Sequence, residues 1–347
     1  MSTYQRVPEA GRGLRLHLNE NTGGCSPAVL AAVRALSAED LAFYPAYADV
    51  ERETAAHLGV DPSWMALVNG LDEGLHIVSL LALRPGTDST GGTAGAMTSI
   101  IPEPAFEMYA ACTAAAGGIA TRVPPGPDFA FAIDGIRAAI DARTRLLYLT
   151  NPNNPTGLTV PAETIAALAR ELPGVTVLVD EAYIDFGGES LLPYLDEQRN
   201  IIIGRTFAKA YGLAALRAGC LIAHPDTLEP IRATLSPYTL NVAAAAALRA
   251  AIADRDWHDR YVRESMASRA LIYAFCDARG IPYYRSAANF VLMRMGPQAT
   301  AVTKALAERG IFIRDRSTQP GCEGCVRITA GLTTHTEQCL RALGERL

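Results

Sequence analysis

Short runs of aliphatic and β-branched residues alternate with helical segments along this chain, and this rhythm constrains the fold more than any other feature. Four such runs are MTSIIP (97–102), TRLLYLT (144–150), VTVLVD (175–180) and NIIIGRT (200–206). Apolar runs of this length that are separated by helices are typical of parallel strands covered on both faces. The sequence therefore predicts an α/β fold with a mostly parallel, doubly wound sheet.

Helical spacing of apolar residues predicts the helices. SPAVLAAVRALSA offers Ser26 as an N-cap residue and places Pro27 at the first helical position. AAAALRAAI and the long charged segment after it predict two further helices, the second of which ends at Gly280. The Gly/Thr-rich segment 87–95 contains too few apolar groups to fold alone, so we expect an exposed loop there.

The C-terminal part of the chain predicts a second, smaller unit. The strand-like segments NFVLMRM, IFIRD and CVRITA surround the helical TAVTKALAERG, a mixture typical of a small α+β domain. We expect residues 1–36 to form an N-terminal arm and part of the small domain. Residues 37–250 are expected to form the large domain, and residues 251–347 the small C-terminal domain.

Composition excludes several classes of partner. The chain has 31 basic and 36 acidic residues and a formal charge of −5, which argues against nucleic acid and against an anionic membrane surface. No long apolar run and no signal peptide is visible, and seven cysteines without a framework spacing fit a reducing compartment, so we expect a cytoplasmic protein. Cys322 and Cys325 form a lone CxxC without a second pair, and we expect no metal site.

Polar residues follow three of the predicted strands directly. NPNNPTG follows the second run, Asp180 ends the third, and Lys209 and Arg217 come after the fourth. Taken singly, these residues have ordinary explanations as a helix cap, a turn and solvated surface charges. Because ligands bind at the carboxyl ends of parallel strands, we expect the three segments to lie together.

In this order and spacing, the three segments resemble the fold type I pyridoxal-phosphate aminotransferases. The resemblance implies that Lys209 carries the cofactor as an internal imine and later moves the substrate proton during transamination. It implies that Asp180 keeps the pyridine nitrogen protonated, so that the ring can withdraw electrons from the substrate Cα. Tyr183 and Asn154 are implied to hydrogen-bond the phenolic oxygen of the ring. Phe106, in PEPAFEMY, is implied to stack on the ring face.

The same resemblance assigns the phosphate contacts of the cofactor. The turn NGLDEG would present the backbone N–H groups of Leu71 and Asp72 at a helix N-terminus, which favours an anion. Thr206 and Arg217 are implied to contribute side-chain contacts. Relatives usually carry a phosphate-binding serine at the position of Ala208, so one hydrogen bond is missing here.

Further motifs resemble the branch of this family that exchanges an amino group between histidinol phosphate and 2-oxoglutarate. LHLNEN, GIFIRDRSTQP and CVRITAG carry this resemblance. It implies that Arg327 binds the substrate α-carboxylate and that Arg314 reaches the phosphate or distal carboxylate. Tyr4 and Asn19 are also implied to contact substrate, Tyr4 from across a dimer. Tyr44 would contact the cofactor phosphate of the neighbouring subunit, so the resemblance implies a homodimer with shared active sites.

Alternatives remain open at this point. An aromatic or natural-product amino acid could be the amino donor, since the same pocket can accept aromatic rings. A lyase such as threonine-phosphate decarboxylase would need the same fold and cofactor residues, because the choice depends on which bond at Cα stands perpendicular to the ring. A regulatory domain without turnover is disfavoured, because the chain has no appended helix-turn-helix and no basic patch.

Overall fold

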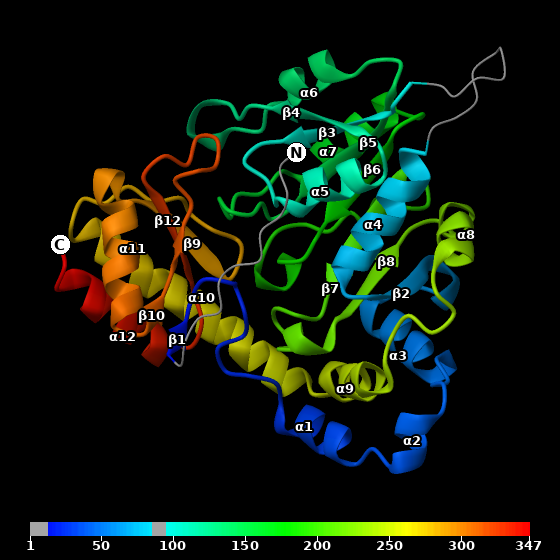
Figure 1. Ribbon diagram of the computed structural model, residues 1–347, viewed down its shortest axis with the longest axis horizontal. Helices are drawn as coiled ribbons and strands as arrows, with labels where there is room; N and C mark the ends of the chain where they lie inside the picture. The colour runs from blue at the N-terminus through cyan, green and yellow to red at the C-terminus, as the bar shows by residue number, and fades with distance from the viewer. Residues whose placement is uncertain (1–12, 85–94) are drawn as a thin grey trace.

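The computed structural model describes residues 13–84 and 95–347, so Tyr4 and nearly all of the predicted 87–95 loop lie outside the described residues (Figure 1). Its centre is a seven-stranded sheet. The strands in spatial order are β2 (Met65–Asn69), β8 (Ala218–Ile222), β7 (Ile201–Thr206), β6 (Thr176–Asp180), β5 (Thr144–Thr150), β3 (Thr98–Pro102) and β4 (Ile119–Val123).

The sheet is mostly parallel, as predicted. β7, β6, β5, β3 and β4 pair in parallel, whereas β8 is antiparallel to both of its neighbours, β7 and β2. β3, β5, β6 and β7 are the four predicted runs, and β2 lies in the short apolar run of WMALVNG, which also predicts a strand, whereas β4 and β8 were not predicted. β4 is half-exposed and carries Arg122, so it lacks the apolar run that marks the central strands.

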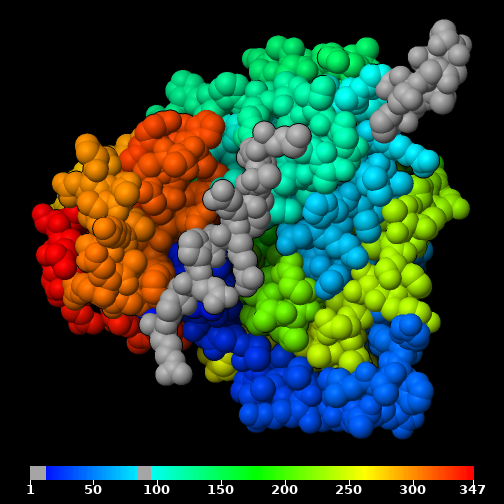
Figure 2. All heavy atoms as spheres, in the orientation of Figure 1, coloured from blue at the N-terminus to red at the C-terminus, as the bar shows by residue number. Residues whose placement is uncertain are grey.

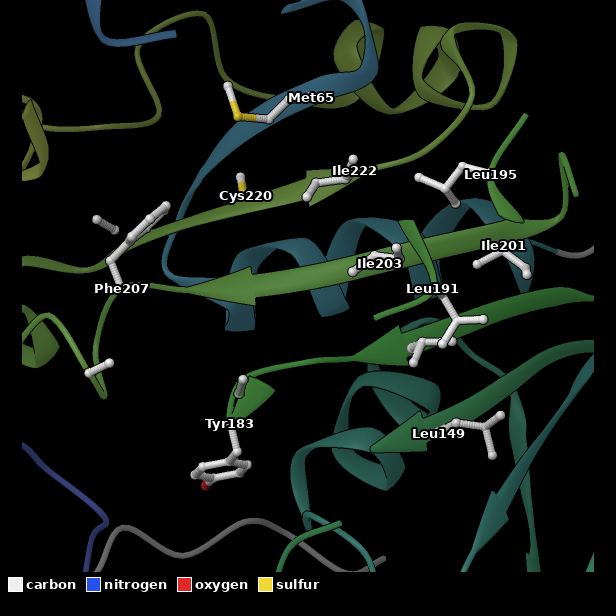
Figure 3. Packing of buried hydrophobic residues seen from close by; sticks show 14 of the residues in the cluster. Met65, Leu149, Tyr183, Leu191, Leu195, Ile201, Ile203, Phe207, Cys220 and Ile222 are labelled. Carbon is white, nitrogen blue, oxygen red and sulfur yellow. The ribbon is translucent and has the colours of Figure 1, made fainter. Parts of the chain in front are cut away.

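Alternate residues of the central strands pack on opposite faces of the sheet. Ile201 and Ile203 belong to one core cluster and Ile202 to the other, as the two-residue period of a strand requires. Figure 3 shows part of the first cluster, where Ile201 and Ile203 lie near Leu191. Helices cover both faces, which confirms the doubly wound arrangement.

The first face is covered by α1 (Pro27–Arg34), α3 (Ala48–Leu58), α6 (Ile133–Ala139), α7 (Ala162–Glu171) and α9 (Val242–Ala253). The second is covered by α4 (Leu71–Ala82), α5 (Met108–Ala115) and α8 (Pro225–Thr234), and the short α2 (Ala38–Ala42) follows α1. α1 begins as predicted, because Ser26 accepts a hydrogen bond from the Val29 amide and Pro27 is the first helical residue.

The small α+β unit contains the antiparallel sheet β11 (Arg314–Asp315), β12 (Cys325–Thr329) and β9 (Phe290–Arg294). Its core packs these strands against α10 (Arg255–Asp277), α11 (Ala299–Glu308) and α12 (Thr333–Gly344). The space-filling view shows this orange and red unit beside the green and cyan large unit (Figure 2).

The segment IFIRD, predicted as one strand, is two strands with different partners. β10 (Ile311–Phe312) pairs in parallel with β1 (Leu14–Arg15), whereas β11 pairs with β12. The partner changes at Ile313, which is buried. The N-terminal arm therefore joins the small unit through β1, while α1 packs on α9 of the large unit; the predicted domain boundaries stay a prediction. No helix within residues 13–84 or 95–347 is long and apolar enough to cross a membrane.

Candidate active site

A cavity of about 310 Å³ opens at the carboxyl ends of β5, β6 and β7. All predicted site residues except Tyr4 and Tyr44 line it. They are Asn19, Leu71, Asp72, Phe106, Asn154, Asp180, Tyr183, Thr206, Lys209, Arg217, Arg314 and Arg327. The structure therefore brings together residues that are far apart in the sequence.

Strand register accounts for the convergence of the three central segments. Thr150, the last residue of β5, pairs with Asp180, the last residue of β6. Asp180 in turn pairs with Gly204 near the end of β7. Parallel strands that end at one level deliver the residues that follow them to one edge of the sheet, and Lys209 follows β7 at this edge.

Lys209 has the environment of a reactive amine. Its Nζ donates a hydrogen bond to the Leu18 carbonyl at 3.1 Å. Burial, and next the positive charge of Arg327, lowers the pKa of Lys209 to about 8. A lysine with so low a pKa has a larger neutral fraction near pH 7 than a surface lysine, and the neutral amine is the nucleophile. The sequence contains just one other lysine, Lys304 on α11, which is exposed.

Asp180 lies at the floor of the cavity and is held by two donors. The Tyr109 hydroxyl donates to Oδ2 at 2.8 Å, and the Ala182 amide donates to Oδ1 at 2.9 Å. Burial raises the pKa of Asp180 to about 6, while the hydrogen bonds from Tyr109 and Ala182 oppose that rise. Asp180 is therefore a buried carboxylate that gains from a positively charged partner.

Tyr183 and Asn19 form a hydrogen-bonded pair at the cavity wall. Asn19 Nδ2 donates to the Tyr183 hydroxyl at 3.1 Å, and the Asn289 side chain donates to the Asn19 carbonyl at 3.0 Å. Asn19 has a φ of 56°, a left-handed conformation that asparagine tolerates better than most residues. Burial raises the pKa of Tyr183, so its hydroxyl is protonated at neutral pH.

The N-terminus of α4 and Arg217 form one end of the cavity. Arg217 Nη2 lies 2.8 Å from Asp72 Oδ2. Gly70, with a φ of 71°, precedes α4, and a Cβ there would lie 2.3 Å from Arg217 Nη2. Thr206 Oγ1 accepts a hydrogen bond from the Ala208 amide at 3.2 Å. This end combines backbone amides, a hydroxyl and a guanidinium, which is a donor set for an anion.

Two predicted arginines lie side by side at the opposite wall. Arg314 on β11 pairs in register with Arg327 on β12. Arg327 Nη2 donates to the His17 carbonyl at 2.7 Å, and Nη1 donates to Asn154 Oδ1. Within the described residues the buried Arg327 Nε has no hydrogen-bond partner. Burial, followed by the charge of Arg316, lowers the pKa of Arg327 to about 9, so a bound carboxylate would relieve an unfavourable site.

Sequence reasoning missed several residues at this site. Tyr109 reaches Asp180, and Arg316 and Glu107 line the cavity and form an ion pair with a 3.0 Å contact between Nη2 and Oε1. Arg316 stands two residues after Arg314 in RDRSTQP, but nothing in that motif indicates which arginine faces a glutamate so distant in the sequence. Only the tertiary fold shows this pairing.

Tyr44 lies elsewhere. It is 76% exposed, and its ring stacks on that of Tyr238 with centroids 3.9 Å apart. Tyr44 lines a separate surface hollow between α2, α3 and α9. Its predicted contact with a neighbouring subunit stays a prediction, as does the role of Tyr4, which lies outside the described residues.

Comparison with known proteins identifies the family of this chain. Residues 12–347 match the family described as aminotransferase class I and II. A histidinol-phosphate aminotransferase of Geobacillus sp. (strain WCH70) is 34% identical over 341 residues, which cover 96% of this chain and 90% of that relative. A second histidinol-phosphate aminotransferase, from Ralstonia nicotianae, is 33% identical over 98% of this chain and 90% of its own length.

A solved structure is similar along nearly the whole chain. The histidinol-phosphate aminotransferase of Sinorhizobium meliloti, crystallised in complex with pyridoxal-5′-phosphate, superposes with a TM-score of 0.86 at 29% identity. The superposition covers 96% of this chain and 90% of that one. The match includes both the large sheet and the small unit.

Proposed function

This chain belongs to the class I and II aminotransferases, and from that premise we propose that it transfers the amino group of histidinol phosphate to 2-oxoglutarate with pyridoxal 5′-phosphate, a step of histidine biosynthesis. The observation that carries the proposal is one cavity in which Lys209, Asp180 and Arg327 meet at the carboxyl ends of the strands. The amino donor is inferred from the relatives described above, which match this chain over about 90% of their own length.

The residues of the cavity fit the cofactor. Gly70 leaves open the space beside Arg217 that a Cβ would fill, and Lys209 is a buried amine whose pKa is lowered. Asp180 is a buried carboxylate that would pair with a cationic ring nitrogen. When bound, pyridoxal phosphate supplies a ring that accepts the electrons released at the substrate Cα.

The side chains then have distinct tasks. Asp180 holds the proton on the ring nitrogen, and Lys209 takes the proton from the substrate Cα and returns it during the exchange. Tyr183 and Asn154 orient the ring through its phenolic oxygen, and Phe106 covers a ring face. These roles would hold the breaking Cα–H bond in a reactive orientation, which lowers the barrier of the proton transfer.

Two groups of donors bind the anionic ends of cofactor and substrate. The amides of Leu71 and Asp72, with Thr206 and Arg217, receive the cofactor phosphate. Arg327 receives an α-carboxylate in a bidentate pair that its unpartnered Nε can join.

The remaining predicted substrate contacts lie near these groups. Arg314 lies beside Arg327 and receives the substrate phosphate or the distal carboxylate of the acceptor. Asn19 contributes a side-chain amide at the wall next to Tyr183.

We also propose a homodimer that completes the site. Tyr44, Phe43 and Leu41 are exposed to 76%, 69% and 66% on one surface, and Tyr238 adds a fourth apolar side chain there. Such a cluster of large apolar groups is typical of an interface. Tyr44 would thereby reach the cofactor phosphate of the partner.

All seven cysteines carry free thiols, which supports a reducing compartment, and we propose the cytoplasm.

A half-reaction tests the proposed function. Histidinol phosphate, added to the holoenzyme without a 2-oxo acid, should convert the bound cofactor to its amine form, and its absorbance should change accordingly. 2-Oxoglutarate should then restore the starting spectrum. An unchanged spectrum at saturating histidinol phosphate would contradict the proposal. In a parallel assay, release of carbon dioxide from threonine phosphate, which carries the carboxylate that histidinol phosphate lacks, would indicate a decarboxylase instead.

A further inference from the structure

Glu107 presents a carboxylate to the active-site cavity, and the proposed reaction assigns no role to this residue. It follows Phe106 directly and precedes the first residue of α5. Its side chain is 35% exposed, whereas that of its partner Arg316 is 5% exposed. Both line the cavity that contains Lys209, so Glu107 is the more accessible member of the pair.

The carboxylate of Glu107 is fixed from behind. Its Oε1 accepts hydrogen bonds from Arg316 Nη2 at 3.0 Å and from Gln319 Nε2 at 3.1 Å. Gln319 is itself anchored, because it donates to the Ala105 carbonyl at 2.9 Å and accepts from Arg316 Nε at 3.1 Å. A carboxylate can accept about four hydrogen bonds, so Glu107 keeps acceptor capacity beyond these two.

The charges around the cavity make this acceptor distinctive. Both oxygens of Asp180 accept hydrogen bonds, from Tyr109 and Ala182, and Asp72 pairs with Arg217 at the phosphate end of the cavity. A further acidic side chain of the wall, Glu20, is paired with Arg15. The two donors to Glu107 described above both contact Oε1, which leaves Oε2 to face the cavity. The basic side chains that line the cavity are donors and favour anionic groups of a ligand; they are Lys209, Arg217, Arg314, Arg316 and Arg327. Glu107 therefore offers an N–H donor of the substrate a carboxylate that is already held in place by Arg316 and Gln319.

We propose that Glu107 is a specificity-determining residue that accepts a hydrogen bond from a ring N–H of the amino donor's side chain. The inference rests on the proposed function, in which that ring is the imidazole of histidinol phosphate. A phenyl ring in the same place would displace water from the carboxylate without replacing its hydrogen bond, which disfavours binding. Glu107 thus selects an amino donor with an imidazole ring over one with a phenyl ring.

The test compares two amino donors on the holoenzyme. Phenylalaninol phosphate keeps the amine and the phosphate of histidinol phosphate but carries a phenyl ring in place of imidazole. In the parent enzyme, kcat/KM should favour histidinol phosphate. In Glu107→Gln this preference should fall roughly tenfold, because a charge-assisted hydrogen bond becomes a neutral one. The loss should arise with histidinol phosphate, while kcat/KM for glutamate should stay within about threefold, since glutamate has no ring N–H.

Two further variants separate specificity from folding. Glu107→Gln leaves Arg316 without its counterion, so the double variant Glu107→Met/Arg316→Met removes both charges together; its donor preference should fall at least as far. Glu103→Gln is the matched control. Glu103 precedes Glu107 in the same segment, is buried and paired with Arg122, and lines a different cavity. This control should keep the parent preference.

The outcomes are distinct. If the parent enzyme converts histidinol phosphate but both Glu107 variants keep the parent preference, the assignment of Glu107 is wrong and the proposed function stands. The same conclusion holds if Glu103→Gln lowers the preference as much as Glu107→Gln. If the parent enzyme fails to convert histidinol phosphate at all, the proposed function itself is overturned.

Discussion

Lys209 and Asp180 derive their chemistry from burial. The same desolvation lowers the pKa of the amine to about 8 and raises that of the carboxyl to about 6, and both shifts favour the uncharged form. A cationic ring nitrogen beside Asp180 would reverse part of that penalty. The site is thus unfavourable without its cofactor and improves when the cofactor binds, as preorganised active sites often do.

The burial of Asp180 predicts a pH-dependent stability difference. The folded-state pKa of about 6 lies above the ordinary value of 3.8, so the folded cofactor-free protein binds the proton more tightly than the unfolded chain. The resulting penalty is absent below about pH 4 and complete above about pH 6. Asp180→Asn should therefore stabilise the cofactor-free protein, by an amount that grows between these pH values toward roughly 3 kcal/mol.

Urea unfolding of both proteins at several pH values measures this difference. A gap that stays constant across pH 4 to 7, or that favours the parent protein at pH 7, would show that Asp180 is not destabilised by burial. Holoenzyme should show the opposite preference at pH 7, because the parent carboxylate then has its partner.

Among the helices and strands, the start of α4 is the place where the structure most clearly requires one residue type, a glycine at position 70. Gly70 combines a φ of 71° with a position at which an added Cβ would lie 2.3 Å from Arg217 Nη2. We predict that Gly70→Ala displaces Arg217 and weakens the binding of pyridoxal phosphate at least roughly tenfold, the effect of losing one charge-assisted contact. A fluorescence titration of the cofactor-free protein measures this affinity.

Gly59 provides the control for Gly70. It has a similar φ of 73°, at the end of α3, but a Cβ there would meet nothing within 4 Å. Gly59→Ala should cost about 1 kcal/mol of stability through backbone strain and leave cofactor affinity unchanged. Equal affinity losses in the two variants would mean that strain alone, and not the place of Arg217, explains the effect.

The central strands were predictable because apolar runs of β-rich residues are a local signal. Strand β8 is equally apolar, yet it begins directly after Arg217, and no local feature distinguishes its reversed direction. The division of IFIRD at Ile313 depends on β1, almost 300 residues earlier. Element type thus followed from local pattern, and pairing did not.

The active site, too, was predictable only where the signal is local in the sequence. Lys209, Asp180 and Arg327 stand in motifs that resemble a known family, and the cavity contains all three. Tyr109 and Arg316 act through partners on other elements: Tyr109 on α5 donates to Asp180, and Arg316 contacts Glu107 across the two units. A single sequence carries no signal for such long-range hydrogen bonds.

At the scale of the whole molecule, the site lies where the large and small units meet. Arg327 of the small sheet donates to Asn154 of the large unit, and the Asn289 side chain binds Asn19 in the N-terminal segment. The predicted dimer would add Tyr44 of the partner. Three parts of the assembly would thus complete one site.

Complementation tests the shared site. Lys209→Ala and Tyr44→Ala should each have low activity alone. After mixing and subunit exchange, half of the dimers should contain both chains, and one of their two sites would have Lys209 and the partner's intact tyrosine. Activity should therefore rise to about a quarter of the parent value, as two-fold symmetry requires. Activity that stays at the level of the separate variants would contradict a shared site, and light scattering that shows a monomer would contradict the dimer.

The central claim is that the cofactor is bound covalently to Lys209, and borohydride reduction of the holoenzyme followed by peptide mass spectrometry tests it most directly. The sequence has just two lysines, Lys209 and Lys304, so Lys304 is an internal control. The account predicts a phosphopyridoxyl group on the Lys209 peptide alone, and loss of both the label and turnover in Lys209→Ala. A label on Lys304, a label on neither lysine, or near-parent turnover in Lys209→Ala would contradict it.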